Sequence, residues 1–387
     1  MRGQIRKRGK SYSVVVFNGK DANGKKKYIW ETFRTSDQAQ KRLTELLHQI
    51  DTGTLARPKG TLGEFTEQWL RDYAKPNLAA TTYQGYVGIY RSGIGPILGN
   101  ILLKDLRPSH IQEYIALKLS KNVSNTTVRH HITFLHSVLE TAIKWQLLIR
   151  NPIDSVTMPK IVKHEMNILN EQQAETILQA VQGTNYYCLF ALALYTGMRK
   201  SELLALQWND VDLLMAELTI CKSSHRLNTG EYIVKSTKTA KSNRRIALSK
   251  KTCTMLKQHL KKEMNRYSKT CSKTSPKFPK DRLLFCEPDG KPLKPNTIGQ
   301  HWTRLLRRLN YPHIRFHDLR HTHASWMLKK GVSPKVIQER LGHSTISTTL
   351  DIYSHVTPGM QQQAVKIFDK ILTRNSDKQR QLVTNTE

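Results

Sequence analysis

Acidic residues are scarce in this sequence. Its 387 residues include 30 Asp and Glu against 62 Lys and Arg, which gives a formal net charge of +32 at pH 7. The positive excess is spread along the chain and is not confined to one tail. It indicates a polyanionic partner, and DNA or RNA fits this charge better than a membrane surface does.

Long apolar runs are also absent. No stretch approaches the roughly 18 apolar residues that are needed to cross a bilayer. The N-terminus, MRGQIRKRGKSYSVVVF, is basic, but its apolar run from Val14 to Phe17 is too short for a secretory signal. The sequence therefore predicts no membrane partner.

Cysteines are few and scattered. The five cysteines lie far apart and form no C-x-x-C pair, which argues against a disulfide framework and against a zinc site. Such a set is typical of a protein in the reducing cytoplasm. The residues are Cys188, Cys221, Cys253, Cys271 and Cys286.

The length predicts two or three domains, because 387 residues exceed what one ordinary core accommodates. We expect a multidomain chain that is mainly α with small β-sheets. Its parts are a small β-sheet plus helix domain (1–57), a four-helix domain (61–150), an α+β domain (166–372) and a polar tail (373–387).

The N-terminal part predicts a three-stranded sheet backed by a helix. Two segments rich in Val, Tyr, Ile, Trp and Phe flank Asn23-Gly24, a pair that favours a hairpin turn. Ser36 is expected to cap a helix, since apolar residues recur after it at helical spacing. The strands are expected at 4–6, 11–17 and 27–34, and the apolar helix positions are Ala39, Leu43, Leu46, Leu47 and Ile50.

Two linkers that contain Pro and Lys precede the next two parts. Residues 54–60 lead into the four-helix part, and residues 151–165 lead from it into the third part. Apolar spacing predicts four helices before Asn151-Pro152, where the proline disfavours helix in the residue before it. The first starts at Thr61 with Leu62, Phe65, Trp69 and Tyr73 on one face, and the others span 81–91, 109–119 and 125–145. In the third part we expect helices at 170–181, 186–195, 249–266, 297–309 and 358–372, and strands at 217–221, 231–234, 244–248 and 283–286.

The string TGMRKSELLALQW, residues 196–208, places Arg199 between two apolar segments. Gly197 is suited to end the preceding helix, which leaves Arg199 in a turn. An arginine in that position needs a partner or lines a cleft. A structural ion pair with Glu202 or Asp210 is the alternative to a functional role.

A second polar cluster lies in HDLRHTHAS. His317, Arg320 and His321 fall at i, i+3 and i+4 and so share one helix face, from which His323 is displaced. Metal binding is a weak alternative, because the motif has no Glu or Cys partner and Arg320 would repel a cation. Further on, Ser333-Pro334 starts a helix that Gly342 ends, so His343 follows in the turn. Tyr353 lies ten residues later in LGHSTISTTLDIYSHV.

These side chains suit attack by a hydroxyl on a DNA phosphodiester. Guanidinium groups fork onto two phosphate oxygens and stay charged, so they stabilise the dianionic transition state without metal. Tyrosine, with a free pKa of about 10, is a modest nucleophile but a reasonable leaving group for the reverse step. Such a reaction conserves bond energy and rejoins strands without ATP.

The order Arg, His-x-x-Arg, Leu-Gly-His and Tyr resembles the signature of the tyrosine recombinases, in particular the integrases of phages and mobile elements. The resemblance implies that Arg199 and Arg320 clamp the phosphate, His317 is a general acid/base, His343 hydrogen-bonds the phosphate and Tyr353 is the nucleophile that forms a 3′-phosphotyrosyl link. Residues 235–248, KSTKTAKSNRRIAL, resemble the family's lysine-bearing hairpin. Lys238 is the best match for the acid that protonates the leaving oxygen, with Lys235 and Lys241 as alternatives.

The resemblance also implies roles for whole domains: arm-type DNA binding for 1–57, core-site binding for 61–150 and catalysis for 166–372. It implies a homo-tetramer on double-stranded attachment sites, no cofactor, no metal and a place in the cytoplasm of a bacterial host. A host DNA-bending protein or an excision factor would be a further partner. The plausible phosphate contacts of the helical domain, each of which is otherwise an ordinary solvated side chain, are Lys75, Thr81, Thr82, Lys121 and Arg129.

Two alternatives stay open at this point. A type IB topoisomerase uses a similar set of Arg, Lys, His and Tyr but only relaxes DNA. A non-catalytic, sequence-specific DNA-binding protein would explain the net charge of +32 equally well. The complete set of candidate catalytic residues speaks against the second alternative, and the arm-like module and His317 speak against the first.

Overall fold

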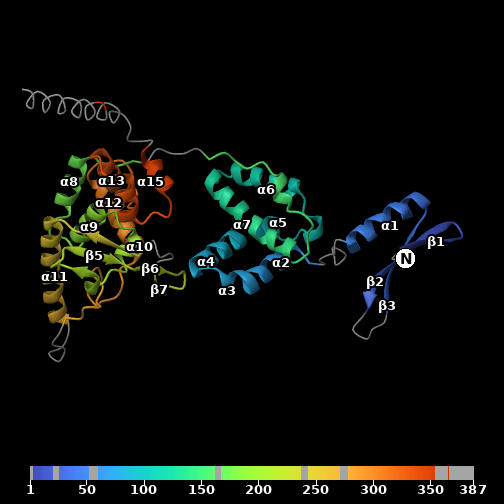
Figure 1. The fold of residues 1–387 in the computed structure, drawn as a ribbon, viewed down its shortest axis with the longest axis horizontal. Coiled ribbons are helices and arrows are strands. Elements are labelled where there is room, and N and C mark those ends of the chain that lie inside the picture. Colours follow the sequence, from blue (N-terminus) through green and yellow to red (C-terminus); the bar gives the residue numbers. More distant parts are fainter. Residues whose placement is uncertain are drawn as a thin grey trace, which may run out of the picture. The chain divides into compact units, whose positions relative to one another are not determined.

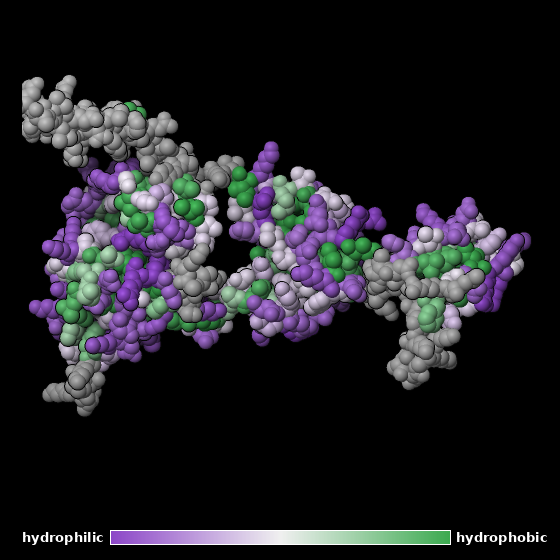
Figure 2. Space-filling model, viewed as in Figure 1, coloured by the Kyte–Doolittle hydropathy of each residue, from purple (hydrophilic) through white to green (hydrophobic). Residues whose placement is uncertain are grey.

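The computed structural model describes residues 3–20, 26–51, 60–161, 167–236, 243–270, 278–353 and Val365. The chain divides into two compact units, Met1–Val162 and Lys163–Glu387 (Figure 1). The first unit holds two separate hydrophobic cores, one under the N-terminal sheet and one among the helices that follow. Hydrophilic side chains dominate the visible surface of each unit (Figure 2).

The N-terminal sheet has the expected three strands, β1 (Gly3–Arg8), β2 (Ser11–Lys20) and β3 (Lys26–Phe33). They pair antiparallel in the order β1-β2-β3, and α1 (Ser36–Asp51) packs on one face. The cap of α1 was predicted one residue too late, because the amide of Gln38 donates to Oγ1 of Thr35 at 3.3 Å. The Asn23-Gly24 turn lies outside the described residues.

The four predicted helices of the second part are present, and π-helical turns interrupt the first two. Leu70–Ala74 joins α2 (Leu62–Trp69) to α3 (Lys75–Asn77), and Tyr90–Ile94 joins α4 (Ala80–Ile89) to α5 (Gly95–Leu98). The wider π turn rotates later residues around the axis, so Tyr73 is 38% exposed although spacing placed it inside. The remaining helices are α6 (Pro108–Ser120) and α7 (Asn125–Lys144), with 3₁₀ turns at Leu103–Asp105 and Pro152–Ser155.

The second unit is built around a central, almost wholly apolar helix. This is α9 (Tyr187–Thr196), which is buried against its neighbours, as its sequence predicts. The other helices are α8 (Glu171–Ala180), α10 (Lys200–Leu203), α11 (Lys250–Thr270), α12 (Pro295–Arg308), α13 (Asp318–Lys329), α14 (Pro334–Leu341) and α15 (Ile346–Tyr353).

Two small antiparallel sheets complete this unit. One has the order β4 (Val211–Asp212), β5 (Glu217–Ile220), β8 (Arg244–Ala247), and the other pairs β6 (Lys222–Arg226) with β7 (Tyr232–Ser236). The strand predicted at 283–286 is wrong, since Leu283 and Cys286 make only isolated bridges to Gln207 and Pro292. The helix predicted at 358–372 and the tail fall outside the described residues, apart from Val365.

Over the part of the chain that the structure describes, no helix is both long and apolar enough to cross a membrane.

Candidate active site

Arg199 lies where the sequence predicts, in the turn between α9 and α10. Gly197 adopts φ 65° and ends α9, a left-handed conformation that favours glycine. Arg199 caps α10, and its Nη1 donates to Oε1 of Glu202 at 2.7 Å. Its Nη2 donates to the carbonyl of Gly342 at 2.8 Å. Arg199 therefore forms the ion pair with Glu202 and still presents part of its side chain to solvent, because that side chain is 35% exposed.

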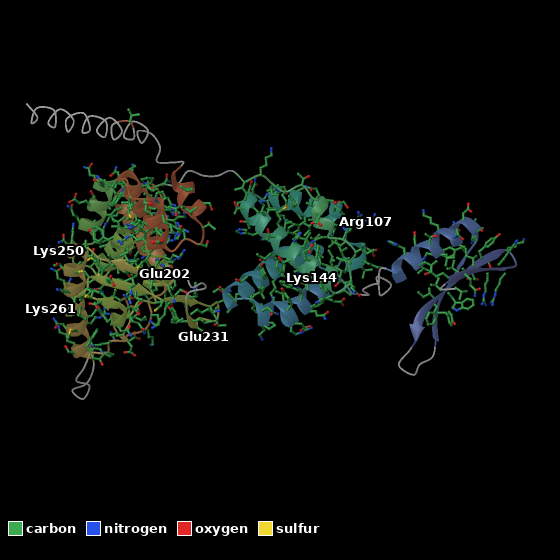
Figure 3. All side chains as sticks on the ribbon, in the orientation of Figure 1. Arg107, Lys144, Glu202, Glu231, Lys250 and Lys261 are labelled. Atoms are coloured by element: carbon green, nitrogen blue, oxygen red, sulfur yellow. The ribbon has the colours of Figure 1, made fainter. Side chains whose placement is uncertain are left out.

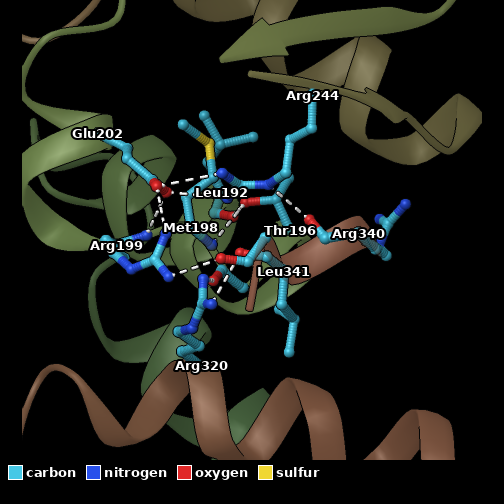
Figure 4. Close-up of polar contacts among 11 residues, drawn as sticks. Leu192, Thr196, Met198, Arg199, Glu202, Arg244, Arg320, Arg340 and Leu341 are labelled. Carbon is cyan, nitrogen blue, oxygen red and sulfur yellow. Dashed lines mark hydrogen bonds and ion pairs between the residues drawn. The ribbon is translucent and has the colours of Figure 1, made fainter. Parts of the chain in front are cut away.

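Glu202 is buried between two arginines (Figure 4). Arg244 donates from Nη1 to Oε1 at 3.1 Å and from Nη2 to Oε2 at 2.9 Å. Burial alone would raise the pKa of Glu202, but the hydrogen bonds and charges of Arg244 and Arg199 lower it. Glu202 is therefore a carboxylate at neutral pH. The alternative partner Asp210 instead accepts from the amide of Gln207.

Arg320 approaches the same turn from α13. It is only 3% exposed, and its Nη1 and Nη2 donate to the carbonyls of Gly197 and Leu341 at 2.9 and 2.7 Å. Leu341 and Gly342 are adjacent, so the two guanidinium groups of Arg199 and Arg320 bind neighbouring carbonyls (Figure 4). The two predicted phosphate clamps are thus brought together, although more than a hundred residues separate them in the sequence.

His343 follows directly after the glycine that ends α14. Gly342 has φ 68°, which turns the chain back toward Arg199. His343 is buried, and its Nδ1 shares a hydrogen bond of 2.8 Å with Oγ1 of Thr349 on α15. Burial, followed by the charges of Arg320 and Arg199, lowers the pKa of His343 to about 3. The ring is neutral at pH 7, and within the described part of the chain its Nε2 makes no hydrogen bond.

His317 stands at the start of α13 with much of its side chain exposed. Its ring meets that of His321 edge-on, with centroids 5.3 Å apart. Desolvation on its protein side, then His321 and Arg320, lower the pKa of His317. It is therefore an unprotonated base at neutral pH and lies three residues before Arg320, at the edge of the arginine cluster.

The electrostatics of this cluster favour an anion. The guanidinium groups of Arg199 and Arg244 both bind the carboxylate of Glu202, and the charge of Glu202 also acts on the nearby guanidinium of Arg320 (Figure 4). Burial, together with the charge of Arg199, lowers the pKa of Arg320, which means that the protein around it disfavours its charge. A bound phosphate would reverse that effect.

The site borders a basic cavity of about 750 Å³. His317 stands in its wall, and so does Lys200, whose pKa burial lowers. Other cationic residues that line it are Arg304, Arg307 and Arg315. The sequence did not identify these residues, or Arg244, as candidates for the site. Their common signal is positive charge on helix and strand faces, which is frequent throughout this chain.

The candidate nucleophile and the candidate lysine are Tyr353 and Lys238. Tyr353 is the last residue of α15, four positions after Thr349, so the two backbone positions share one face of the helix. Lys238 lies outside the described residues, between β7 and β8. The expected hairpin at 235–248 is wrong in one respect, because β7 pairs with β6 whereas β8 pairs with β5.

The candidate phosphate contacts of the helical domain lie on its surface to different degrees. Lys75, Thr81 and Lys121 are exposed, whereas Thr82 is half-buried. Arg129 is half-buried too, and its Nη1 donates to the carbonyl of Pro159 at 3.2 Å. The structure therefore leaves Lys121 more available to DNA than Arg129.

One group in this domain has the spacing of a cation site. Ligand atoms of His136, Glu140 and Asp154 lie within 4.8 Å of one another. These side chains are solvent-accessible, and Nε2 of His136 is already paired with Oδ1 of Asp154 at 3.2 Å. No such group among the described residues includes His317 or His321.

Three family matches cover most of the chain. Residues 167–360 match the phage integrase family, residues 61–118 match the phage integrase N-terminal SAM-like domain, and residues 4–50 match the arm DNA-binding domain.

Individual relatives and solved structures also match most of the chain. A tyrosine recombinase XerC-like protein of Caldanaerobacter subterraneus is 28% identical over 94% of this chain and 97% of its own. The ICEBs1 integrase of Bacillus subtilis is 25% identical over 77% and 79%. Among solved structures, the Tn1549 transposon integrase in complex with a circular intermediate DNA has a TM-score of 0.67 at 22% identity, covering 80% of this chain and 100% of that one. A lambda integrase dimer bound to a core site has a TM-score of 0.58 at 17% identity, covering 91% and 94%.

Proposed function

The chain belongs to the phage integrase family and is a tyrosine-type site-specific recombinase, and on that premise we propose which of its residues break and rejoin DNA. Tyr353 attacks the scissile phosphodiester through its phenolic oxygen, forming a 3′-phosphotyrosyl bond as the bond to the 5′-oxygen breaks. Lys238 protonates that leaving oxygen. The freed 5′-hydroxyl of another strand then attacks the phosphotyrosine, which reverses the chemistry and releases Tyr353.

The observation that carries this assignment is the convergence of Arg199 and Arg320 on the neighbouring carbonyls of Gly342 and Leu341. Guanidinium groups fixed in this way are preorganised for the charge that develops on the phosphate oxygens, and one such donor is worth roughly 3–4 kcal/mol. Neutral His343 supplies an Nε2 for a further hydrogen bond to the phosphate. His317 is suited to accept the proton of the Tyr353 phenol, because its lowered pKa leaves it unprotonated.

We further propose the division of labour among the domains. The sheet of residues 1–57 binds arm-type DNA, residues 61–150 bind the core site, and residues 166–372 carry out strand exchange. On the exposed face of the sheet, the guanidinium groups of Arg6 and Arg8 lie 5.7 and 5.8 Å from the ring of Trp30, so cationic and aromatic groups are available to DNA. The working assembly is a homo-tetramer on two attachment sites in a bacterial host, and a lambda integrase tetramer bound to a Holliday junction shares this fold.

Covalent trapping tests the assignment. The full chain is incubated with supercoiled plasmid carrying its own gene and flanks, in EDTA, and quenched with detergent. We expect a protein–DNA adduct from the wild type and from Tyr311→Phe, which removes a hydroxyl outside the site. Tyr353→Phe should give none.

Three outcomes would contradict the proposal. Retarded DNA without adduct, from the plasmid and also from nicked suicide duplexes that tile the flanks, would favour a DNA-binding protein without catalysis. An adduct that survives in Tyr353→Phe would move the nucleophile to another residue. Relaxed plasmid without any recombinant product would favour the topoisomerase-like alternative.

A further inference from the structure

Arg244 is a buried arginine of the cluster that makes three hydrogen bonds, and the proposed function assigns it no role. Its side chain is 5% exposed. Both terminal nitrogens fork onto the two oxygens of Glu202, and Nε donates to the carbonyl of Arg340 at 2.7 Å (Figure 4). A buried, bidentate contact of this kind fixes both position and charge far better than an exposed pair does.

The partner that Arg244 holds is the same carboxylate that contacts Arg199. Oε1 of Glu202 accepts from Nη1 of Arg199 at 2.7 Å, and Oε2 accepts from the Arg199 amide at 2.8 Å. Glu202 therefore divides its charge between two guanidinium groups. Without Arg244, the whole buried carboxylate would act on Arg199 and would compete with a phosphate for it.

Arg244 also supports the other partner of Arg199. A Cβ atom added to Gly342 would lie 3.0 Å from Nη1 of Arg244, so this guanidinium packs directly under the turn. The carbonyl of Gly342 in that turn accepts from Nη2 of Arg199. Arg199 is oriented by the Glu202 carboxylate and the Gly342 carbonyl. The buried side chain of Arg244 binds the first group and packs against the turn that holds the second.

The place of Arg244 in the chain adds a third connection. It is the first residue of β8 and comes six positions after Lys238. β8 is fixed by antiparallel pairing with β5, where Arg244 lies opposite Ile220. The start of β8, six residues after Lys238, is therefore fixed at the arginine cluster.

We infer that Arg244 is a positioning residue for strand cleavage: it takes part of the charge of the Glu202 carboxylate that Arg199 also contacts, and it fixes the start of β8, six residues after Lys238, beside the arginine clamp. The inference rests on the proposed roles of Arg199 and Lys238. Arg244 would act on the reacting phosphate through these partners, because its Nη1 and Nη2 donate to Glu202 and its Nε donates to the carbonyl of Arg340.

The test uses the nicked suicide duplex from the flank that gave the adduct, at saturating enzyme, so that cleavage is measured apart from binding. Arg244→Lys keeps the charge but loses the fork, and we expect cleavage to slow by roughly 10–100-fold with unchanged DNA affinity. Arg245→Lys is the matched control. Arg245 is the next residue of β8, its side chain is 76% exposed, and its weak pair with Glu217 spans 3.8 Å.

A second pair of variants separates positioning from general damage. Arg244→Gln should cleave more slowly than Arg244→Lys, because Glu202 then acts on Arg199 alone. Adding Glu202→Gln removes that charge, so the double variant should cleave several-fold faster than Arg244→Gln. Lowering the pH should also speed Arg244→Gln relative to wild type, since the loss of Arg244 raises the pKa of Glu202 and lets it become neutral.

The outcomes separate the proposed function from the role of Arg244. A wild-type protein that binds the duplexes tiling the flanks but forms an adduct on none of them would overturn the proposed function and this role with it. An active wild type together with Arg244→Lys at the rate of Arg245→Lys would overturn the role of Arg244 alone. So would a double variant slower than both single variants, since independent structural damage accumulates.

Discussion

Arg340 donates a hydrogen bond from Nε to Nε2 of His323 at 3.2 Å. The other ring nitrogen, Nδ1, is 2.9 Å from the carbonyl of Leu194, which can only accept. His323 is therefore neutral, with its proton on Nδ1. It links the last turn of α9 to α14 directly behind the site. Burial, followed by the charge of Arg340, lowers the pKa of His323 to about 4.

This link makes folding sensitive to acid. Because the pKa of His323 is about 4 in the folded chain and 6.5 as a reference, the unfolded state binds more protons between these values. The contribution of neutral His323 to the free energy of unfolding is fully present above pH 6.5. It is lost as the pH falls toward 4, by at most about 1.4 kcal/mol per pH unit. In urea unfolding, the free energy of unfolding should fall less between pH 7.5 and pH 5 for His323→Gln than for the wild type. Replacing the exposed His313 with Gln should leave the pH dependence unchanged.

Arg320→Lys tests the clamp. A lysine at this buried position retains the charge but binds only one of the two carbonyls that Arg320 holds, so the ammonium is displaced from the phosphate side. We expect single-turnover cleavage to fall by roughly 10²–10³-fold while the dissociation constant for DNA changes little. Arg308→Lys, on an exposed part of α12, serves as the charge-conserving control. A clamp role would be untenable if Arg320→Lys cleaved as fast as that control.

Gly197→Ala should destabilise the catalytic unit more than an ordinary glycine replacement. Gly197 has φ +65°, and an added Cβ would lie 2.5 Å from Cδ2 of Leu341 and 3.0 Å from the ring of His323. Gly331 has φ +80° but open space around it, so Gly331→Ala measures the backbone cost alone, about 1–2 kcal/mol. Denaturant unfolding should give Gly197→Ala a further loss of about 1–3 kcal/mol from overpacking. Equal losses for the two variants would contradict the close packing of this turn.

Much of the site could be predicted from the sequence because its signals are local. Gly197 and Gly342 each end a helix, and each places a candidate site residue, Arg199 or His343, in the turn that follows. The helical spacing of His317 and Arg320 is equally direct. No local rule reports that Arg320 reaches back to Gly197, because that contact depends on how α13 packs against α9.

The features that the sequence did not reveal have weak local signals. The strand β6, KSSHR, is polar and lacks the apolar alternation that identified β5 and β8. Apolar spacing with a 3.6-residue period does not report the π turn at Leu70–Ala74, and Tyr73 in that turn is exposed although this period placed it inside. Arg244 is one of two consecutive arginines in SNRRIAL, and only the fold shows that it is buried and Arg245 is exposed.

The salt dependence of DNA binding distinguishes the candidate contacts of the helical domain. Lys121 is exposed just after α6, so Lys121→Gln should weaken binding and reduce the slope of log K against log salt by about 1. Arg129 already donates to the carbonyl of Pro159, and Arg129→Gln should reduce the slope less. Lys144, labelled in Figure 3 and exposed at the opposite end of α7 from Arg129, provides the control, and Lys144→Gln should leave the slope unchanged. Titrations at several salt concentrations would assign Lys121 to the DNA interface if only its variant flattened the slope. Equal slopes for the three variants would place the phosphate contacts of this domain on other residues.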